Sequence, residues 1–173
     1  LDGIAKGYTS LRVIQIMKDC GIEHAIINLG GNVQVLGTKA DGSDWRVAIQ
    51  NPASENSYLG ILSTADKAVI TSGGYERYFE QDGVRYHHIL DPKTGHPAAS
   101  GLQSVSVVSQ DDTLADALST ALFVMGLDAG AALYRAGDLA FEAVFMTDDG
   151  SVWITPGLAG QYQSARPYQV LQP

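Results

Sequence analysis

Tight glycine-containing turns recur along the 173-residue chain, and each joins two short segments rich in β-branched and aromatic residues. These turns lie at Gly30–Gly31, at Gln81–Asp82–Gly83 and at Asp148–Asp149–Gly150. Because short turns of this composition connect antiparallel neighbours, each of them predicts a β-hairpin. Further strands are expected over WRVAIQNP, over QSVSVVS and over the stretch LGILSTADKAVITSGG. A chain built largely from hairpins favours antiparallel sheets over a doubly wound parallel one.

Two or three helices are expected among the hairpins. Residues 3–19 carry apolar side chains at helical spacing, and Gly21 supplies a C-terminal stop. A second helix is expected at about residues 113–126, where apolar residues form one stripe, and a third at 128–136. The sequence therefore predicts an α+β fold, with antiparallel-rich twisted sheets and two to three helices, in a single domain over residues 1–173.

The composition limits the classes of function. A hydrophobic fraction of 45% allows a core without disulfides or structural metals, and the single cysteine, Cys20, excludes an intrachain disulfide. The net charge of −8 argues against nucleic-acid binding, and an anionic ligand would need a lysine, backbone amides or a divalent cation nearby. No apolar run reaches the ~18 residues of a membrane span. The chain starts without methionine, so we expect it to be part of a longer protein.

The second expected helix has a polar face opposite its apolar stripe. Asp116 and Thr120 are four residues apart on this face, with Ser119 beside them. A carboxylate with one or two hydroxyl groups suits a hard cation such as Mg²⁺. An acidic residue favoured by the helix dipole, with solvent-facing hydroxyls, explains the same spacing. Spacing alone favours this second explanation.

Polar residues beside glycines could bind a ligand at three further places. Lys6 could supply a charge for a phosphate and Gly3 its carbonyl oxygen, at the start of the first helix. The turns NLGGN, with Asn32, and TSGGYE, with Ser72 and Gly73, offer consecutive N–H groups that could cradle a phosphate or the polar edge of a flavin. An exposed lysine and two ordinary hairpin turns explain the same residues equally well.

The segment RYHHILDPKTGHP, residues 85–97, contains two adjacent histidines. Since side chains alternate along a strand, His87 and His88 should face opposite sides and cannot readily chelate one metal ion. Tyr86, His88 and Leu90 share one face. A histidine is suited to act as a general base near neutral pH, although a histidine with a purely structural role is more common.

Six segments together resemble one protein family. LDGIAKGY, NLGGNVQVLG, WRVAIQNP, ITSGGYERYF, RYHHILDPKTGHP and DALSTALFVMG occur in the order seen in the ApbE-type flavin transferases, the FAD:protein FMN transferases. The resemblance runs from Leu1 to about Gly126. It implies the C-terminal portion of an ApbE-like, or T-fold-like, domain, without the N-terminal part that supplies much of the FAD pocket in the family.

The resemblance also implies an activity. In the family, a Mg²⁺-dependent reaction cleaves FAD and attaches FMN through a phosphoester bond to Ser or Thr of a target protein, with release of AMP. The expected partners are FAD and an acceptor protein, typically a subunit of a membrane redox complex, and not nucleic acid. The expected location is periplasmic, or extracytoplasmic and anchored to a membrane.

By position, the resemblance implies roles for individual residues. The expected metal ligands are Gly3, through its carbonyl oxygen, Asp116, Ser119 and Thr120; the expected FAD contacts are Lys6, Asn32, Ser72, Gly73 and Leu90; the expected base is His88. Two alternatives remain open, an FAD pyrophosphatase that forms FMN and AMP and a non-catalytic flavin-binding partner module. Gly74, where family members often carry Asp, Asn or Ser, weighs for the second alternative.

Overall fold

The computed structural model describes residues 2–172, so that Leu1, the first residue of the first motif, lies outside the described residues. The helices are η1 (Asp2–Ile4), α1 (Ala5–Asp19), α2 (Asp112–Met125), α3 (Leu127–Ala136) and η2 (Pro156–Leu158). The strands are β1 (Ala25–Leu29), β2 (Asn32–Leu36), β3 (Trp45–Asn51), β4 (Ser54–Thr64), β5 (Ala68–Gly73), β6 (Tyr78–Gln81), β7 (Val84–His87), β8 (Leu102–Ser109), β9 (Glu142–Thr147), β10 (Val152–Ile154), β11 (Tyr162–Gln163) and β12 (Gln169–Val170).

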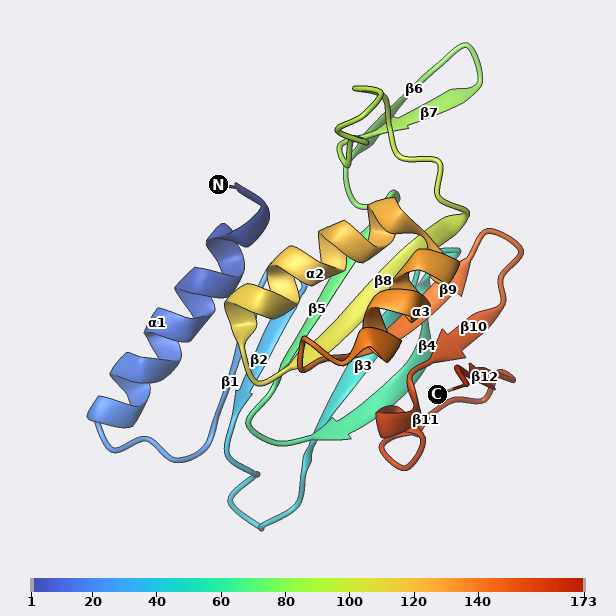
Figure 1. Ribbon diagram of the computed structural model, residues 1–173. Helices are drawn as coiled ribbons and strands as arrows, with labels where there is room; N and C mark the ends of the chain where they lie inside the picture. Colours follow the sequence, from blue (N-terminus) through green and yellow to red (C-terminus); the bar gives the residue numbers. More distant parts are fainter. Residues whose placement is uncertain (1, 173) are drawn as a thin grey trace.

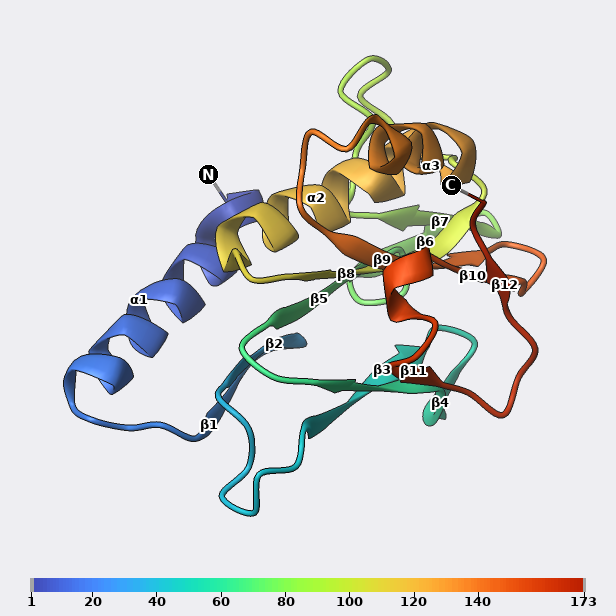
Figure 2. The ribbon, with the colours of Figure 1, turned by 60° about the horizontal axis from the view of Figure 1, so that its bottom comes forward.

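Three sheets organise these strands. The largest has seven strands in the order β1-β2-β5-β8-β9-β10-β12, and all neighbours are antiparallel except β10 and β12. A three-stranded sheet, β11-β4-β3, packs against one face of it, and helices α2 and α3 cover the other face (Figures 1 and 2). The hairpin β6–β7 stands apart as a third sheet. The predicted α+β fold of antiparallel sheets and helices is therefore confirmed.

The central strands bury side chains on both faces. On β8, Val105 and Val107 face the helices, whereas Val108 faces the three-stranded sheet. Helix α1 lies beside α2 at the edge of the molecule, where Ile14 packs on Ile27 and its neighbours on β1 and β2. Within the described residues, no helix is long and apolar enough to cross a membrane.

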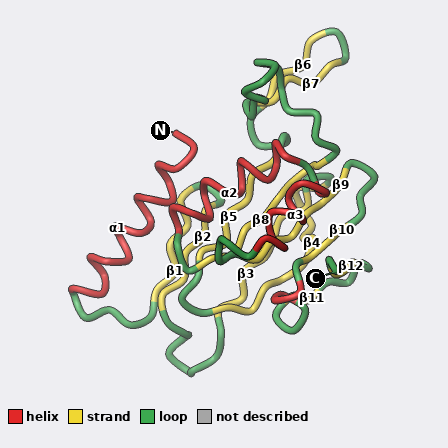
Figure 3. The backbone as a smooth tube through the Cα atoms, in the orientation of Figure 1, coloured by secondary structure: helices red, strands yellow, loops and turns green. Residues whose placement is uncertain are grey.

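Most of the predicted elements are present, with two differences. The helix expected at 113–126 spans Asp112–Met125, and the helix expected at 128–136 spans Leu127–Ala136. The stretch LGILSTADKAVITSGG, however, divides between β4 and β5, which belong to different sheets. The turn contains Asp66, whose φ of 51° is left-handed and whose carboxylate accepts from the N–H of Gly37. The second difference concerns β7, which ends at His87, so that His88 begins an irregular loop (Figure 3).

Candidate active site

A cavity of about 730 Å³ opens where five segments of the chain meet. They are the start of α1, the turn between β1 and β2, the end of β5 with the residues after it, the loop after β7, and the middle of α2. The residues that line the cavity are Gly3, Lys6, Leu29, Gly30, Thr71, Ser72, Gly73, Glu76, Arg77, His88, Ile89, Leu90, Asp116 and Thr120. Segments far apart in the sequence thus contribute to one site.

The cavity contains most of the site residues expected from the sequence. Eight of the ten line it: Gly3, Lys6, Ser72, Gly73, His88, Leu90, Asp116 and Thr120. The other two, Asn32 and Ser119, are buried and bond to lining residues. Asn32 Nδ2 donates to Asp116 Oδ1 at 3.1 Å, and the Ser119 and Ser72 hydroxyl oxygens are 2.9 Å apart. The structure therefore brings all ten residues together.

The packing of α2 directs Asp116 towards the cavity. Asp111 caps the helix, since its carboxylate accepts from the N–H of Leu114 at 2.9 Å. The apolar stripe, with Leu118 and Leu122, packs on β5 and β8. Asp116 lies off this stripe, on the side of α2 that meets α1, and only 5% of its surface is exposed.

Two neutral donors hold the Asp116 carboxylate. The backbone N–H of Gly7 donates to Oδ2 at 2.7 Å, and Asn32 donates to Oδ1. The close approach of α1 requires glycine at position 7, because a Cβ there would lie 2.7 Å from the Cβ of Asp116 and closer still to the carbonyl oxygen of Asp112. The carboxylate therefore has a fixed orientation that depends on both α1 and β2.

A chain of hydroxyl groups connects α2 with β5. Ser119 Oγ donates to the Asp116 carbonyl oxygen at 2.9 Å, and a carbonyl oxygen can only accept. Because that bond uses its one hydrogen, Ser119 accepts from Ser72, and Ser72 in turn accepts from Thr120, 3.2 Å away. Thr120 thus keeps its lone pairs for a further partner in the cavity. Ser119 is fully buried and bonded on both sides, so it supports the other groups.

The oxygen atoms at this end of the cavity suit a divalent cation. Asp116 has no Lys or Arg partner, since the only salt bridge among the described residues joins Arg85 and Glu80. A buried carboxylate held only by neutral groups favours a nearby cation. Among the side chains that the structure describes, no three from His, Cys, Asp or Glu form a metal cluster. A cation here would rely on one carboxylate with hydroxyl and carbonyl oxygens, a set that suits Mg²⁺ better than a transition metal.

His88 lines the cavity with one ring nitrogen already committed. Its Nδ1 lies 3.2 Å from the carbonyl oxygen of Arg77, and its backbone N–H donates to the same oxygen at 3.1 Å. Because a carbonyl oxygen can only accept, Nδ1 carries the hydrogen of the neutral ring. The lone pair then resides on Nε2, and the exposed imidazole has the tautomer that a general base requires.

His87 points away from this cavity, as strand alternation predicts. Its Nε2 lies 3.2 Å from the carbonyl oxygen of Ala98, and its ring packs edge-on against Phe123 at a centroid distance of 5.5 Å. A Cβ on Gly74 would lie 2.9 Å from the His87 ring, so the absence of a side chain at position 74 leaves room for that ring. His87 therefore has a packing role, and the two histidines do not share a ligand.

Two charged residues of the cavity were missed at the sequence level. Glu76 and Arg77 both line it. Burial raises the pKa of Glu76, and the positive charges of Lys6 and His88 partly oppose that shift. The sequence TSGGYER could have indicated both residues, because Glu76 and Arg77 follow closely after a glycine turn that was itself a candidate ligand-binding segment.

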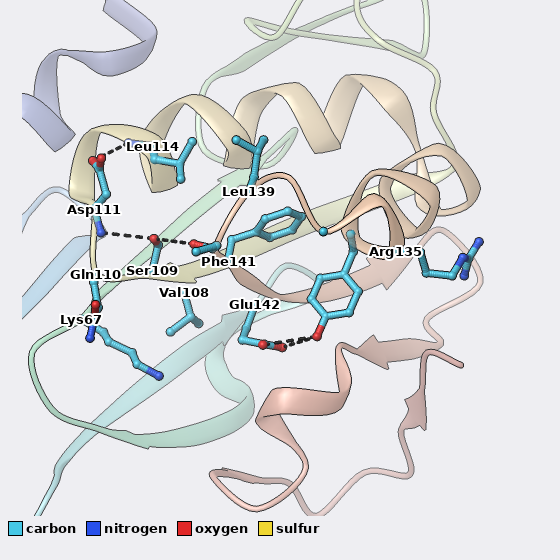
Figure 4. Close-up of a pocket in the computed structure, with 13 residues that line it drawn as sticks. Lys67, Val108, Ser109, Gln110, Asp111, Leu114, Arg135, Leu139, Phe141 and Glu142 are labelled. Carbon is cyan, nitrogen blue, oxygen red and sulfur yellow. Dashed lines mark hydrogen bonds between the residues drawn. The ribbon is translucent and has the colours of Figure 1, made fainter. Parts of the chain in front are cut away.

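Other cavities also border α2. A largely apolar one of about 1010 Å³ shares Gly3, Leu90 and Thr120 with the site and continues along the outer face of the helix. Figure 4 shows another, about 830 Å³, beside the first turn of α2. None of the ten expected residues lines that cavity. Its polar groups bond to one another, since the Tyr134 hydroxyl donates to the Glu142 carboxylate at 3.3 Å.

Comparison with known proteins places these observations in a family. The ApbE family profile matches residues 1–145. The FAD:protein FMN transferase of Klebsiella pneumoniae (strain 342) is 41% identical over 153 residues, which are 88% of this chain and 46% of that protein. The protein of the same name from Vibrio cholerae is 40% identical over 151 residues, 87% of this chain and 45% of that protein. The chain thus spans about half the length of the curated relatives it matches.

Solved structures agree with these matches. The ApbE protein of Thermotoga maritima superposes with a TM-score of 0.80 at 39% identity, covering 87% of this chain and 48% of that one. The flavin transferase ApbE from Vibrio cholerae superposes with a TM-score of 0.76 at 36% identity, covering 91% of this chain and 50% of that one. The order of motifs, the fold and the matched length lead to one conclusion: the chain belongs to the ApbE family.

Proposed function

We propose that this chain supplies the general base and the cation-binding residues of an FAD:protein FMN transferase. The complete protein would cleave FAD and attach FMN through a phosphoester bond to Ser or Thr of an acceptor protein, with release of AMP. One observation carries the proposal: a single cavity combines a buried carboxylate without a cationic partner and a histidine with a free Nε2. The name shared by the relatives, FAD:protein FMN transferase, supports it.

Asp116, Thr120 and the carbonyl oxygen of Gly3 are the proposed Mg²⁺ ligands. When bound, the ion would neutralise the pyrophosphate of FAD and polarise a phosphoryl oxygen. The chain's own contribution is a fixed geometry. Gly7 and Asn32 orient the Asp116 carboxylate, and the hydroxyl chain through Ser72 orients Thr120. Ser119, a ligand by resemblance, instead holds that hydroxyl chain in place.

The remaining lining groups suit two parts of FAD, its pyrophosphate and an aromatic ring system. Lys6 places a positive charge on the cavity for the pyrophosphate, which a chain of net charge −8 would otherwise repel. Ser72 and Gly73 line the same cavity. Leu90 is 52% exposed at the boundary with the apolar cavity, where it can cover part of an aromatic ring system.

His88 is the proposed base. Its Nε2 would take the proton of the acceptor hydroxyl while that oxygen forms a bond to the FMN phosphorus. The bond from this phosphorus to the bridging oxygen breaks, and AMP leaves with that oxygen. General-base catalysis of this kind contributes typically ~10²–10⁴-fold in rate. Glu76, close enough to interact with His88, would stabilise the imidazolium that results.

The decisive experiment uses the full-length protein. It is incubated with FAD, Mg²⁺ and candidate acceptors, and the acceptor mass and the free nucleotides are measured. A mass gain of one FMN on a Ser or Thr supports the transferase. Release of FMN and AMP with no acceptor modified supports the pyrophosphatase, a second candidate favoured by the exposure of His88 to solvent. Absence of FAD cleavage contradicts both.

The acceptor and the cellular location are also part of the proposal. By resemblance to the family, the acceptor is a subunit of a membrane redox complex and the protein works outside the cytoplasm. Fractionation of cells that express the full-length protein tests the location, and recovery of the enzyme only in the cytoplasm would contradict it.

A further inference from the structure

The hairpin β6–β7 projects from the body of the molecule, and no other strand of residues 2–172 pairs with it (Figure 1). Every residue of β6 is exposed, and Phe79 is exposed by 61%. A two-stranded hairpin is at best marginally stable alone, and an exposed aromatic ring gains free energy when a partner covers it. This arrangement raises the question of what the hairpin contacts.

Side-chain pairs across the strands give the hairpin two distinct faces. On one face, Phe79 lies opposite Tyr86, and their rings stack with centroids 5.1 Å apart and planes 9° apart. On the other face, Arg85 lies 4.1 Å above the ring of Tyr78 and 3.3 Å from the Glu80 carboxylate. The first face is aromatic, and the second holds a paired charge.

The aromatic face is the one that leads to His88. The backbone N–H of His88 donates to the carbonyl oxygen of Arg77, which extends the hairpin ladder beyond the last pair, Tyr78 with His87. Strand alternation then places Tyr86 and His88 on the same side. Exposure follows this alternation, since His88 is exposed and Ile89 is buried. Two residues along a strand span about 7 Å, so the Phe79–Tyr86 stack lies roughly that far from His88 along the hairpin.

We propose that the Phe79–Tyr86 stack is the docking surface for the acceptor protein. The inference rests on the function proposed above, in which the acceptor hydroxyl must reach His88 Nε2 and its chain must therefore pass the base of the hairpin. An extended segment rises about 3.3 Å per residue, so a side chain two or three residues from the modified Ser or Thr reaches the stack. The stack takes an apolar side chain at that position, because flat exposed aromatic rings are frequent centres of protein–protein contact.

The test compares two aromatic residues on opposite faces of the hairpin. The acceptor is the protein that gains one FMN with the full-length wild-type enzyme. With Phe79→Ala, we expect the KM for this acceptor to rise about tenfold while kcat changes less than about twofold. Tyr78→Ala, the matched control, should leave both constants within about twofold, and Phe79→Tyr should restore the wild-type KM.

A double-mutant cycle locates the contact on the acceptor. In the acceptor variant, Gly replaces the apolar residue two or three positions from the modified hydroxyl. This change should raise KM by a similar factor, and its combination with Phe79→Ala should raise KM little further. An unchanged KM for Phe79→Ala, or an equal rise for Tyr78→Ala, would overturn the inference. So would a lower Tm or weaker FAD binding in Phe79→Ala, since the stack would then be an internal contact. If only the docking inference is wrong, the wild-type enzyme still transfers FMN. If the proposed function is wrong, neither the wild type nor any variant transfers FMN.

Discussion

His88 and His87 each give one ring nitrogen to a backbone carbonyl, but they use different nitrogens. His88 uses Nδ1 on Arg77, so its basic nitrogen is Nε2, on the exposed side of the ring. His87 uses Nε2 on Ala98, and its Nδ1 is buried without a hydrogen-bond partner. Only one of the two adjacent histidines can therefore exchange a proton with a molecule in the cavity.

Replacing His88 separates proton transfer from positioning. With His88→Asn, whose side-chain amide can still donate to the Arg77 carbonyl, we expect FMN transfer to fall ~10²–10⁴-fold, as much as with His88→Ala. FAD binding should change by less than about threefold in both variants. Single-turnover transfer and FAD titration of the full-length protein measure the two effects. A collapse of FAD binding would instead make His88 a ligand contact.

Removal of the Asp116 carboxylate tests the cation site. On the function proposed above, Mg²⁺ should raise the Tm of the wild-type protein by binding the folded state. Asp116→Ala should abolish both this rise and Mg²⁺-dependent FAD turnover. Asp44→Ala, an exposed carboxylate away from the cavity, is the control and should keep both. Retention of the Mg²⁺-induced rise in Asp116→Ala would rule out this metal assignment.

The resemblance to the family pointed to the candidate site residues but not to their connections. It singled out His88, Leu90, Asp116 and Thr120, whereas the spacing of Asp116 and Thr120 alone favoured an ordinary polar helix face. The bond between Asn32 and Asp116 joins residues from different elements, and no spacing rule reveals it. For the same reason, the sequence could not indicate that Ser119 supports the site rather than lining it.

At the scale of elements, α1 and α2 meet along a face with unpaired polar groups. Among the described residues, Ser10 Oγ and Asp112 Oδ2 are buried without a hydrogen-bond partner. Burial, together with the charge of Asp111, raises the pKa of Asp112 to about 7. The folded chain therefore favours the neutral form of Asp112, and ionisation of this carboxyl weakens the contact between the helices.

The pH dependence of stability follows from this shift. The unfolded carboxyl has a pKa of about 4, so the folded state binds the proton more tightly and loses stability as the pH rises from about 4 towards 7. Asp112→Asn cannot ionise. Its urea midpoint should equal that of the wild type near pH 4 and exceed it at pH 8. For Asp44→Asn, the difference in urea midpoint from the wild type should not change with pH. A difference for Asp112→Asn that is the same at pH 4 and pH 8 would contradict the raised pKa of Asp112.

The elements that the sequence predicted best have strong local signals. The helix α2 was placed within about one residue at each end, because its apolar stripe and the glycine after it mark both limits. The division between β4 and β5 was missed, because it depends on a left-handed Asp66 and on two sheets that no periodicity distinguishes. The isolation of β6–β7 is likewise a property of the assembled sheets.

At the scale of the whole molecule, two cores lie on opposite faces of the seven-stranded sheet. Leu122 of α2 is buried in the core beneath the helices, and Leu62 of β4 is buried in the core beneath the three-stranded sheet. The site residues Asp116 and Thr120 lie on α2, so the first core contacts their helix directly, whereas the second core reaches them only through strands of the seven-stranded sheet.

Matched truncations in the two cores should therefore differ in function but not in stability. Leu122→Ala and Leu62→Ala should each lower the free energy of unfolding by about 2–5 kcal/mol. At a temperature well below both melting points, Leu122→Ala should also weaken the Mg²⁺-induced rise in Tm, because α2 shifts into the space left behind. If Leu62→Ala weakens the Mg²⁺-induced rise in Tm as much as Leu122→Ala does, the prediction is wrong, and the sheet transmits the effect of the second core to α2.

The hydrogen bond between Gly7 and Asp116 has a consequence for biosynthesis. Gly7 is synthesised before His88, and Asp116 follows only after all eight strands β1–β8 have been made. On the function proposed above, a nascent chain that already carries the base and the lysine would still have no place for the cation. Docking of α2 on α1 would thus complete the site, and a partly synthesised chain would leave cellular FAD intact.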